Sequence, residues 1–352
     1  MRQFLNTFFQ AKEAVQQLAR PSTGSAGQGA PRPLSEEFRQ LLETRVVPLL
    51  APLENFRLHK LGQKSWRKTW FLRLGWLLYL PALALDIVML EDGELTMYTL
   101  LVLLAAVIWV FYPEIQYVRH YKQKLMPVLV QAFGDYHYSE DGCVDLDALK
   151  SFEILPVYSS KSSEDYIRGS VEEVGFEFCE LKLERRANRN RTNVHRGAIL
   201  VMTMPFEFPA VTVVQPDFGR VGNLLAGSGG RERVTLAHPE FGQRYDVTAD
   251  DPEYARHLLT PAMAERIIEL DDLFRARAQG SGLSCEFRGN RVVFLLSYFG
   301  DLLDTIDIDV SAYDLEHMPL IEQELAMVTG MVRQLKLDWL ASRHTGAWRA
   351  SS

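Results

Sequence analysis

Carboxyl groups and a phenol lie close together around a segment whose pattern predicts a strand. Asp165 and Tyr166 come shortly before residues 171–183, where apolar and polar residues partly alternate, and Glu177 and Glu180 lie inside that stretch. Paired acids transfer protons or bind a metal where their surroundings shift one pKa away from the other. These glutamates do not share one face of an alternating strand. We therefore expect a solvated strand face or a hydrogen-bonded turn, and Asp165, Tyr166 and Glu180 form the candidate polar site.

A run of basic residues overlaps the end of this predicted strand. It begins at Lys182, asparagines are interspersed in it, and its candidate binding residues are Arg185, Arg186, Arg189, Arg191 and Arg196. A loop of this kind attracts anionic lipid headgroups, at about 1 kcal/mol for each Lys or Arg near the membrane surface. Nucleic acid is a poorer fit, because the formal net charge is -7 and no aromatic residues between the arginines offer stacking platforms. The pattern leaves a solvated loop, an anionic lipid and a protein partner open.

The eight histidines and three cysteines are scattered along the chain. They form neither a His-x-x-x-His pair nor a Cys-x-x-Cys pair, so the sequence predicts no metal site. It also contains neither a Gly-x-Ser-x-Gly nucleophile motif nor a phosphate-binding Gly-x-x-x-x-Gly-Lys-Ser/Thr motif. We therefore expect no metal, no cofactor and no catalytic residue. Cysteines without paired spacing suit a reducing compartment.

Two apolar stretches stand out in the first third of the chain. Residues 70–90 and 95–112 flank a short acidic turn at 91–94. Each stretch has about 18 to 21 residues, the length that a helix needs to cross about 30 Å of hydrocarbon. The pattern predicts a two-helix transmembrane hairpin at residues 70–112.

The charges around the hairpin predict its orientation. Lys and Arg crowd both outer flanks, whereas the turn carries three acids and no base. Basic flanks remain on the cytoplasmic side, so we expect both termini in the cytosol and an inner-membrane location. Asp86 lies inside the first apolar stretch, near the acidic turn, and an interfacial position is its expected role. The alternative is proton or ion handling, which would suit a transporter subunit.

The pattern after the hairpin indicates an α+β domain. Strand candidates and helix candidates alternate with Gly- and Pro-bearing turns, at 171–183, 198–204, 211–215, 234–237 and 245–248 for strands and at 252–258, 261–276 and 319–340 for helices. Arg288-Gly289-Asn290 is expected to turn a β-hairpin between 283–287 and 291–296. The whole chain divides into an amphipathic helix and linker (1–34), a cytoplasmic helix (35–69), the transmembrane hairpin (70–112), a cytoplasmic α+β domain (113–340) and a tail (341–352).

Several short motifs follow one another in a recognisable order. They are Tyr158, Glu164-Asp165-Tyr166-Ile167-Arg168-Gly169, Val174-Gly175-Phe176-Glu177-Phe178-Cys179-Glu180-Leu181, Arg196-Gly197-Ala198-Ile199-Leu200, Glu240-Phe241-Gly242-Gln243-Arg244-Tyr245-Asp246-Val247 and Glu253-Tyr254-Ala255-Arg256-His257-Leu258-Leu259-Thr260-Pro261. Downstream of a predicted hairpin, this order resembles the bacterial membrane proteins grouped as domain of unknown function 3137, over about residues 36–310. That family has no assigned reaction. The resemblance implies a membrane architecture and location, and it implies no catalytic residues.

The sequence thus predicts an α+β protein of the bacterial inner membrane. N-terminal helices and the transmembrane hairpin precede a cytoplasmic, mostly antiparallel sheet domain that ends in a C-terminal helix. The expected function is that of a membrane-anchored, non-enzymatic interaction module, which binds a protein partner or anionic lipid headgroups through its cytoplasmic domain. The alternative is a membrane-bound enzyme that acts on a lipid or a nucleotide.

Overall fold

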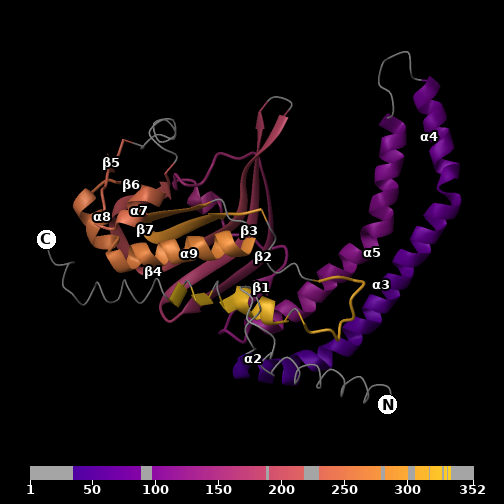
Figure 1. Cartoon of the computed structure of the whole chain (residues 1–352), viewed down its shortest axis with the longest axis horizontal. Coiled ribbons are helices and arrows are strands. Elements are labelled where there is room, and N and C mark those ends of the chain that lie inside the picture. The colour runs from indigo at the N-terminus through magenta and orange to yellow at the C-terminus, as the bar shows by residue number, and fades with distance from the viewer. Residues whose placement is uncertain are drawn as a thin grey trace. The chain divides into compact units, whose positions relative to one another are not determined.

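The computed structural model of the chain (Figure 1) describes most of the residues between Ser35 and Arg333. The described residues are 35–88, 97–187, 190–217, 230–278, 282–299, 306–316, 318–326, 329–330 and 332–333. The predicted amphipathic helix and linker (1–34), the acidic turn (91–94) and the tail (341–352) lie outside them. The chain divides into two compact units: a helical unit, Met1–Leu129 with Thr305–Leu320, and a sheet unit, Val130–Asp304 with Ile321–Ser352.

The helical unit begins with one helix that changes its winding near the first proline. Ser35 caps α2 (Glu36–Leu41), and its hydroxyl accepts the Phe38 N–H, as the sequence predicts for a Ser N-cap. A π-helical turn (Leu42–Val46) leads into α3 (Val47–Leu74). Pro48 has no N–H and its ring crowds the preceding turn, so the wider winding comes where a regular hydrogen bond is lost.

The predicted first membrane span is divided between two helices. α3 continues into the apolar stretch and ends at Leu74, Gly75 is its C-cap, and α4 (Trp76–Val88) begins at the next residue. The second stretch forms part of α5 (Met97–Val130). Among the described residues, one helix, Thr99–Val130, is long and apolar enough to cross a membrane, and Trp76–Asp86 is apolar but shorter.

Helices α3 and α5 run antiparallel, as contacts along their length show. The rings of Phe56 and His120 are 4.2 Å apart, and the Arg67 guanidinium donates to the Trp109 carbonyl over 2.7 Å. Residues that come later in α3 therefore meet residues that come earlier in α5. The side-by-side course of α4 and α5 in Figure 1 continues this arrangement.

Residues 306–316, which come after the sheet in the sequence, are held against α3 by hydrogen bonds to an ion pair within that helix. Glu54 and Arg57 lie one turn apart and pair over 2.7 Å. Arg57 also donates to the Ile308 carbonyl over 2.8 Å, and Glu54 accepts the Ala312 N–H over 2.8 Å. Each charge thereby satisfies a backbone group of the segment, which compensates for its own partial burial.

The described part of the sheet unit contains a seven-stranded, antiparallel sheet, with strand order β1-β2-β3-β4-β6-β5 and β7 paired to β4. Its strands are β1 (His137–Ser139), β2 (Ser160–Val171), β3 (Val174–Ala187), β4 (Asn190–Pro216), β5 (Glu232–Arg233), β6 (Tyr245–Ala249) and β7 (Gly282–Ser297). Its helices are the 3-10 turn Asp147–Leu149, α7 (Pro239–Arg244), α8 (Pro252–Leu258) and α9 (Pro261–Ala278). The predicted α+β class with a mostly antiparallel sheet is confirmed.

The two faces of the sheet are covered by different parts of the chain. One, the cover face, carries Cys179, Leu181, Ile199 and Val293 and packs under residues 143–158, the cover segment. Side chains alternate along a strand, so the neighbouring residues Phe178, Leu200 and Phe294 face the other way. Helix α9 lies over that second face, the α9 face, where Phe274 stacks on Tyr298 with ring centroids 5.8 Å apart (Figure 1).

A buried carboxylate ties down the end of the cover segment. Glu286 accepts the backbone N–H groups of Glu153 and Ile154 over 2.6 and 3.2 Å, and Arg288 donates to its other oxygen over 2.6 Å. Burial raises the pKa of Glu286. The three donors stabilise its charged form and hold the cover segment against β7.

The structure corrects the predicted hairpin at Arg288-Gly289-Asn290. β7 passes through these residues without reversing and pairs with β4 on both sides of them. Gly289 has a φ of 57° and lies opposite Phe208, where the register shifts. The turn-forming residues therefore make an irregularity within one long strand, which a local pattern does not distinguish from a reversal.

The predicted helices at 252–258 and 261–276 are confirmed as α8 and α9, with a proline at the first position of each. In the predicted C-terminal helix, residues 318–326, 329–330 and 332–333 are helical. The apolar side chains of Met318, Ile321, Leu325 and Val332 in this segment are buried.

Candidate functional site

The candidate arginines lie on a β-hairpin arm, which corrects the predicted loop. Strands β3 and β4 continue to pair beyond the sheet core, with Arg185 opposite Thr192 and Arg186 opposite Arg191. Both faces of this arm are exposed, so hydrophobic alternation, the sequence signal for a strand, is missing there. Arg189 lies outside the described residues.

The pairing register of β3 and β4 in the arm determines on which face of the sheet each basic side chain lies. Directly opposed residues in an antiparallel pair share a face, and successive residues alternate. Lys182 opposes Arg196, and Arg186 opposes Arg191, so these four side chains share the α9 face. Arg185 projects from the other face. We call Lys182, Arg186, Arg191 and Arg196 the basic strip.

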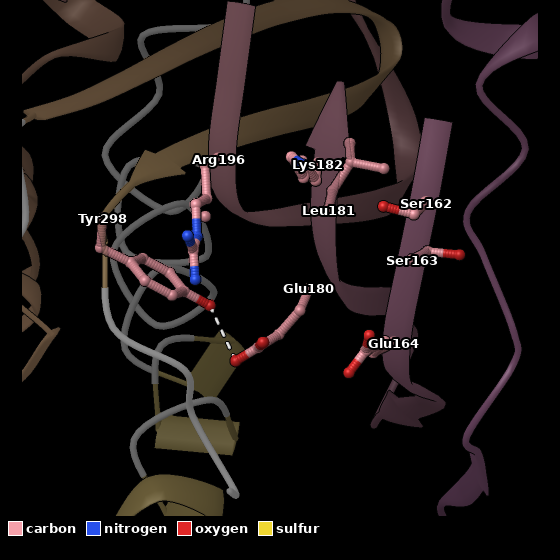
Figure 2. A pocket seen from close by; sticks show the side chains of 9 residues that line it. Ser162, Ser163, Glu164, Glu180, Leu181, Lys182, Arg196 and Tyr298 are labelled. Atoms are coloured by element: carbon pink, nitrogen blue, oxygen red, sulfur yellow. Dashed lines mark hydrogen bonds between the residues drawn. The ribbon is translucent and has the colours of Figure 1, made fainter. Parts of the chain in front are cut away.

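The inner end of the basic strip borders a polar pocket of about 220 Å³. Figure 2 shows the Arg196 and Tyr298 side chains beside Glu180, and Glu164 on the neighbouring strand. The Tyr298 hydroxyl donates to Glu180 over 3.1 Å. Tyr298 is itself buried, and its ring stacks on Phe274 of α9. This stack holds the Tyr298 hydroxyl in place beside Glu180.

Two cations, Lys182 and Arg196, and two carboxylates, Glu164 and Glu180, line this pocket. Glu164 lies directly opposite Glu180, and Lys182 pairs with Glu184 over 2.7 Å. The hydrogen bond from Lys182 lowers the pKa of Glu184. The pocket therefore offers charge-assisted hydrogen bonds of both signs, which suits a polar ligand or a charged peptide segment.

Asp165 lies at a β-bulge and does not line the pocket. Between Glu164 and Ile167 the register of β2 on β3 shifts by one residue, and Asp165 has a φ of 54°. Its carboxylate is buried and accepts the Tyr138 hydroxyl. Burial and the neighbouring Asp165 raise the pKa of Tyr138, which stays a donor. In this position Asp165 holds β1 and β2 together.

Tyr166 is directed to the cover face by the same bulge. Its ring packs against the hydrophobic cluster there, and its hydroxyl hydrogen-bonds with Glu177. Burial raises the pKa of Tyr166 to about 12. Of the three candidate polar residues, only Glu180 lines the pocket; its carboxylate neighbour is Glu164. The extra residue of the bulge separates Asp165 and Tyr166, and the local sequence carries no signal for it.

A serine–histidine contact on the cover face was not predicted. His195 is buried, and its Nδ1 lies 3.5 Å from the Ser297 hydroxyl. Burial lowers the pKa of His195 to about 4, so the ring is neutral near pH 7. Within the described part of the chain, no carboxylate hydrogen-bonds to this ring. The contact therefore lacks the third group that orients the histidine in catalytic triads.

Comparisons with known proteins identify a matching family, but that family has no assigned activity. The family described as protein of unknown function (DUF3137) matches residues 193–337. Curated proteins give no significant match. Among solved structures, the chain is similar to the crystal structure of the mycobacterial trehalose monomycolate transport factor A, with 8% sequence identity, a TM-score of 0.27 and coverage of 56% of this chain and 88% of that chain. A likeness this distant supports no conclusion about fold or function. Residues 193–337, which run from β4 to the C-terminal helix, thus match the DUF3137 family that the motifs predicted.

Proposed function

We propose that this chain is a membrane-anchored, non-enzymatic interaction module of the bacterial inner membrane. Its sheet domain binds a protein partner or anionic lipid headgroups at the basic strip. The observation that carries the proposal is the apolar surface of α4 and α5. Leu78, Leu100 and Ile108 are 68%, 63% and 54% exposed, with many apolar neighbours equally uncovered. A continuous apolar surface on helices of this length suits lipid better than water.

The contacts of Asp86 support a two-span hairpin. Its carboxylate accepts the Thr99 N–H over 2.9 Å, which links the end of α4 to the first turn of α5. A carboxylate at a helix N-terminus satisfies an unpaired backbone donor and the helix dipole. This role explains an acid near the end of an apolar helix without ion transport. The first span would then combine the end of α3 with α4.

Aromatic and basic side chains support the same placement in the bilayer. Trp66, Trp70 and Trp109 form a cluster, with ring centroids 5.8 and 6.2 Å apart, and the Arg67 guanidinium lies 5.3 Å from the centre of the Trp109 ring. Trp and basic residues gather at the cytoplasmic headgroup level of membrane proteins. This cluster would therefore mark the inner boundary of the bilayer, with both termini and the sheet domain in the cytosol.

The basic strip is the part of the sheet domain best suited to an anionic ligand. Arg186 and Arg191 oppose each other at the outer part of the arm and are exposed. The Glu184 carboxylate near them pairs with Lys182 over 2.7 Å, and Arg191 contributes a weaker attraction to the same carboxylate. Membrane anchoring raises the local concentration of headgroups and of other membrane proteins around this strip. The enzyme alternative has less support, because the pocket contains only one of the three residues proposed for it.

The test is co-purification of the full chain in mild detergent, followed by mass spectrometry of the retained proteins and lipids. The double variant Arg186→Gln/Arg191→Gln should lose the companion. The control Arg185→Gln/Arg256→Gln removes the same charge from the opposite face of the arm and from α8, and it should retain the companion. An empty wild-type preparation, or equal retention by both double variants, would contradict the proposal.

A further inference from the structure

Two cysteines far apart in the sequence meet where the cover segment crosses the sheet. Just before the cover segment, the backbone at Glu140 pairs with β2, because the Asp165 N–H donates to the Glu140 carbonyl over 3.2 Å. The backbone then passes close over the bulge in β2 at Gly142, because a Cβ at this position would lie only 2.6 Å from Tyr166. Beyond this crossing, the Val144 N–H donates to the Cys179 sulfur on β3. The Cys143 side chain therefore lies directly beside Cys179.

The two thiols have complementary environments. The Cys179 S–H donates to the Cys143 sulfur, and the Ser163 hydroxyl donates to the same sulfur, and both hydrogen bonds lower the pKa of the Cys143 thiol. Cys143 is half-buried, whereas Cys179 is fully buried and its pKa is raised by the hydrogen bond to Cys143 and by burial. An accessible thiolate beside a protected thiol is the arrangement of a reactive cysteine and its resolving partner.

Cys285 supplies an internal comparison. It is fully buried on β7, opposite Val214, and faces the α9 side of the sheet. Burial raises the pKa of its thiol above the usual range. A buried, protonated thiol reacts slowly with oxidants, because the thiolate is the nucleophile.

We propose that Cys143 and Cys179 form a peroxide-responsive thiol pair that closes reversibly into a disulfide. The Cys143 thiolate attacks one oxygen of hydrogen peroxide, the O–O bond breaks, and hydroxide leaves. Cys143 is thereby oxidised to a sulfenic acid. The Cys179 sulfur then attacks the Cys143 sulfur, and its proton joins the departing hydroxide to form water. The S–S bond forms, and two molecules of a small thiol reduce it again, with formation of their own disulfide.

The disulfide would fasten the cover segment to β3 beside the pocket. Glu286 already holds the far end of the segment through Glu153 and Ile154. The bond would hold the near end, next to Glu180 and Leu181 of the pocket wall. The inference is independent of what the basic strip binds.

The test uses the reduced full-length chain in detergent. The protein is treated with hydrogen peroxide, denatured, alkylated and digested without reductant, and the peptides are identified by mass spectrometry. We expect loss of the free thiols of Cys143 and Cys179, a peptide linked through them, and an alkylated Cys285. The link should disappear after treatment with dithiothreitol.

Variants separate the two steps. Cys179→Ser should stop the reaction at a Cys143 sulfenic acid, which dimedone traps, whereas Cys143→Ser should give neither sulfenic acid at Cys179 nor a link. Cys285→Ala should leave the link unchanged. In the wild-type protein, a link that includes Cys285, a link between two chains, or three alkylated thiols after peroxide would overturn the proposal, whatever the folding of the variants.

Discussion

The buried histidine of β4 predicts a loss of stability in mild acid. His195 is 6% exposed, and burial lowers its pKa to about 4, with the Ala198 backbone partly opposing the shift. In the unfolded chain its pKa returns to the ordinary value of 6.5. Between these two pKa values the ring is protonated in the unfolded state and neutral in the folded state. The stabilising contribution is complete above pH 6.5 and is lost as the pH falls below that value.

The two pKa values give the size of this effect. Between pH 7 and pH 5 the linkage relation gives a loss of about 2 kcal/mol in the free energy of unfolding. Below pH 4 the folded state is protonated too, and the loss levels off. A loss of this size is a large part of the stability of a typical domain.

Urea-dependent pulse proteolysis of the full chain in detergent measures this loss at pH 7 and pH 5. His195→Gln replaces the ring with a polar group that does not titrate, so its stability should fall by about 2 kcal/mol less than that of the wild type over this range. The control is His257→Gln on α8, where the side chain is exposed. It should match the wild type. Equal losses in the wild type and His195→Gln would refute the reasoning.

Three further substitutions test contacts outside the site. Gly142→Ala places a Cβ 2.6 Å from Tyr166 and should cost about 1 to 3 kcal/mol in urea denaturation, whereas Gly175→Ala meets only an ordinary contact at 3.8 Å and should be neutral. Arg57→Met leaves Glu54 without its ion pair and should speed proteolysis at residues 306–316, unlike a change at an exposed α3 lysine such as Lys68→Met. Asp165→Ala should destabilise the chain by about 1 to 3 kcal/mol, because Tyr138 loses its acceptor. Asp165→Asn should restore most of that loss, and equal loss in both variants would argue against the assigned role.

Features that depend on neighbouring residues could be predicted from the amino-acid sequence. Ser35 caps α2, and prolines begin α8 and α9, because capping and proline geometry act within one turn. The apolar stretches likewise predicted the apolar helices α4 and α5 with their exposed apolar side chains, since hydropathy sums over adjacent residues. The short motifs also indicated the DUF3137 family, whose match covers residues 193–337, because each motif is a run of adjacent residues.

The way the strands meet depends on the tertiary fold. The bulge at Asp165 and Tyr166 separates two candidate residues, and the register of β3 on β4 brings four cations to one face of the arm. The cover segment brings Cys143 to Cys179 over a bulge that no local pattern marks. A shift of one residue reverses which face a side chain occupies, and register depends on partners distant in the sequence. For this reason the sequence named the residue types of the site, and the fold determined which of them share it.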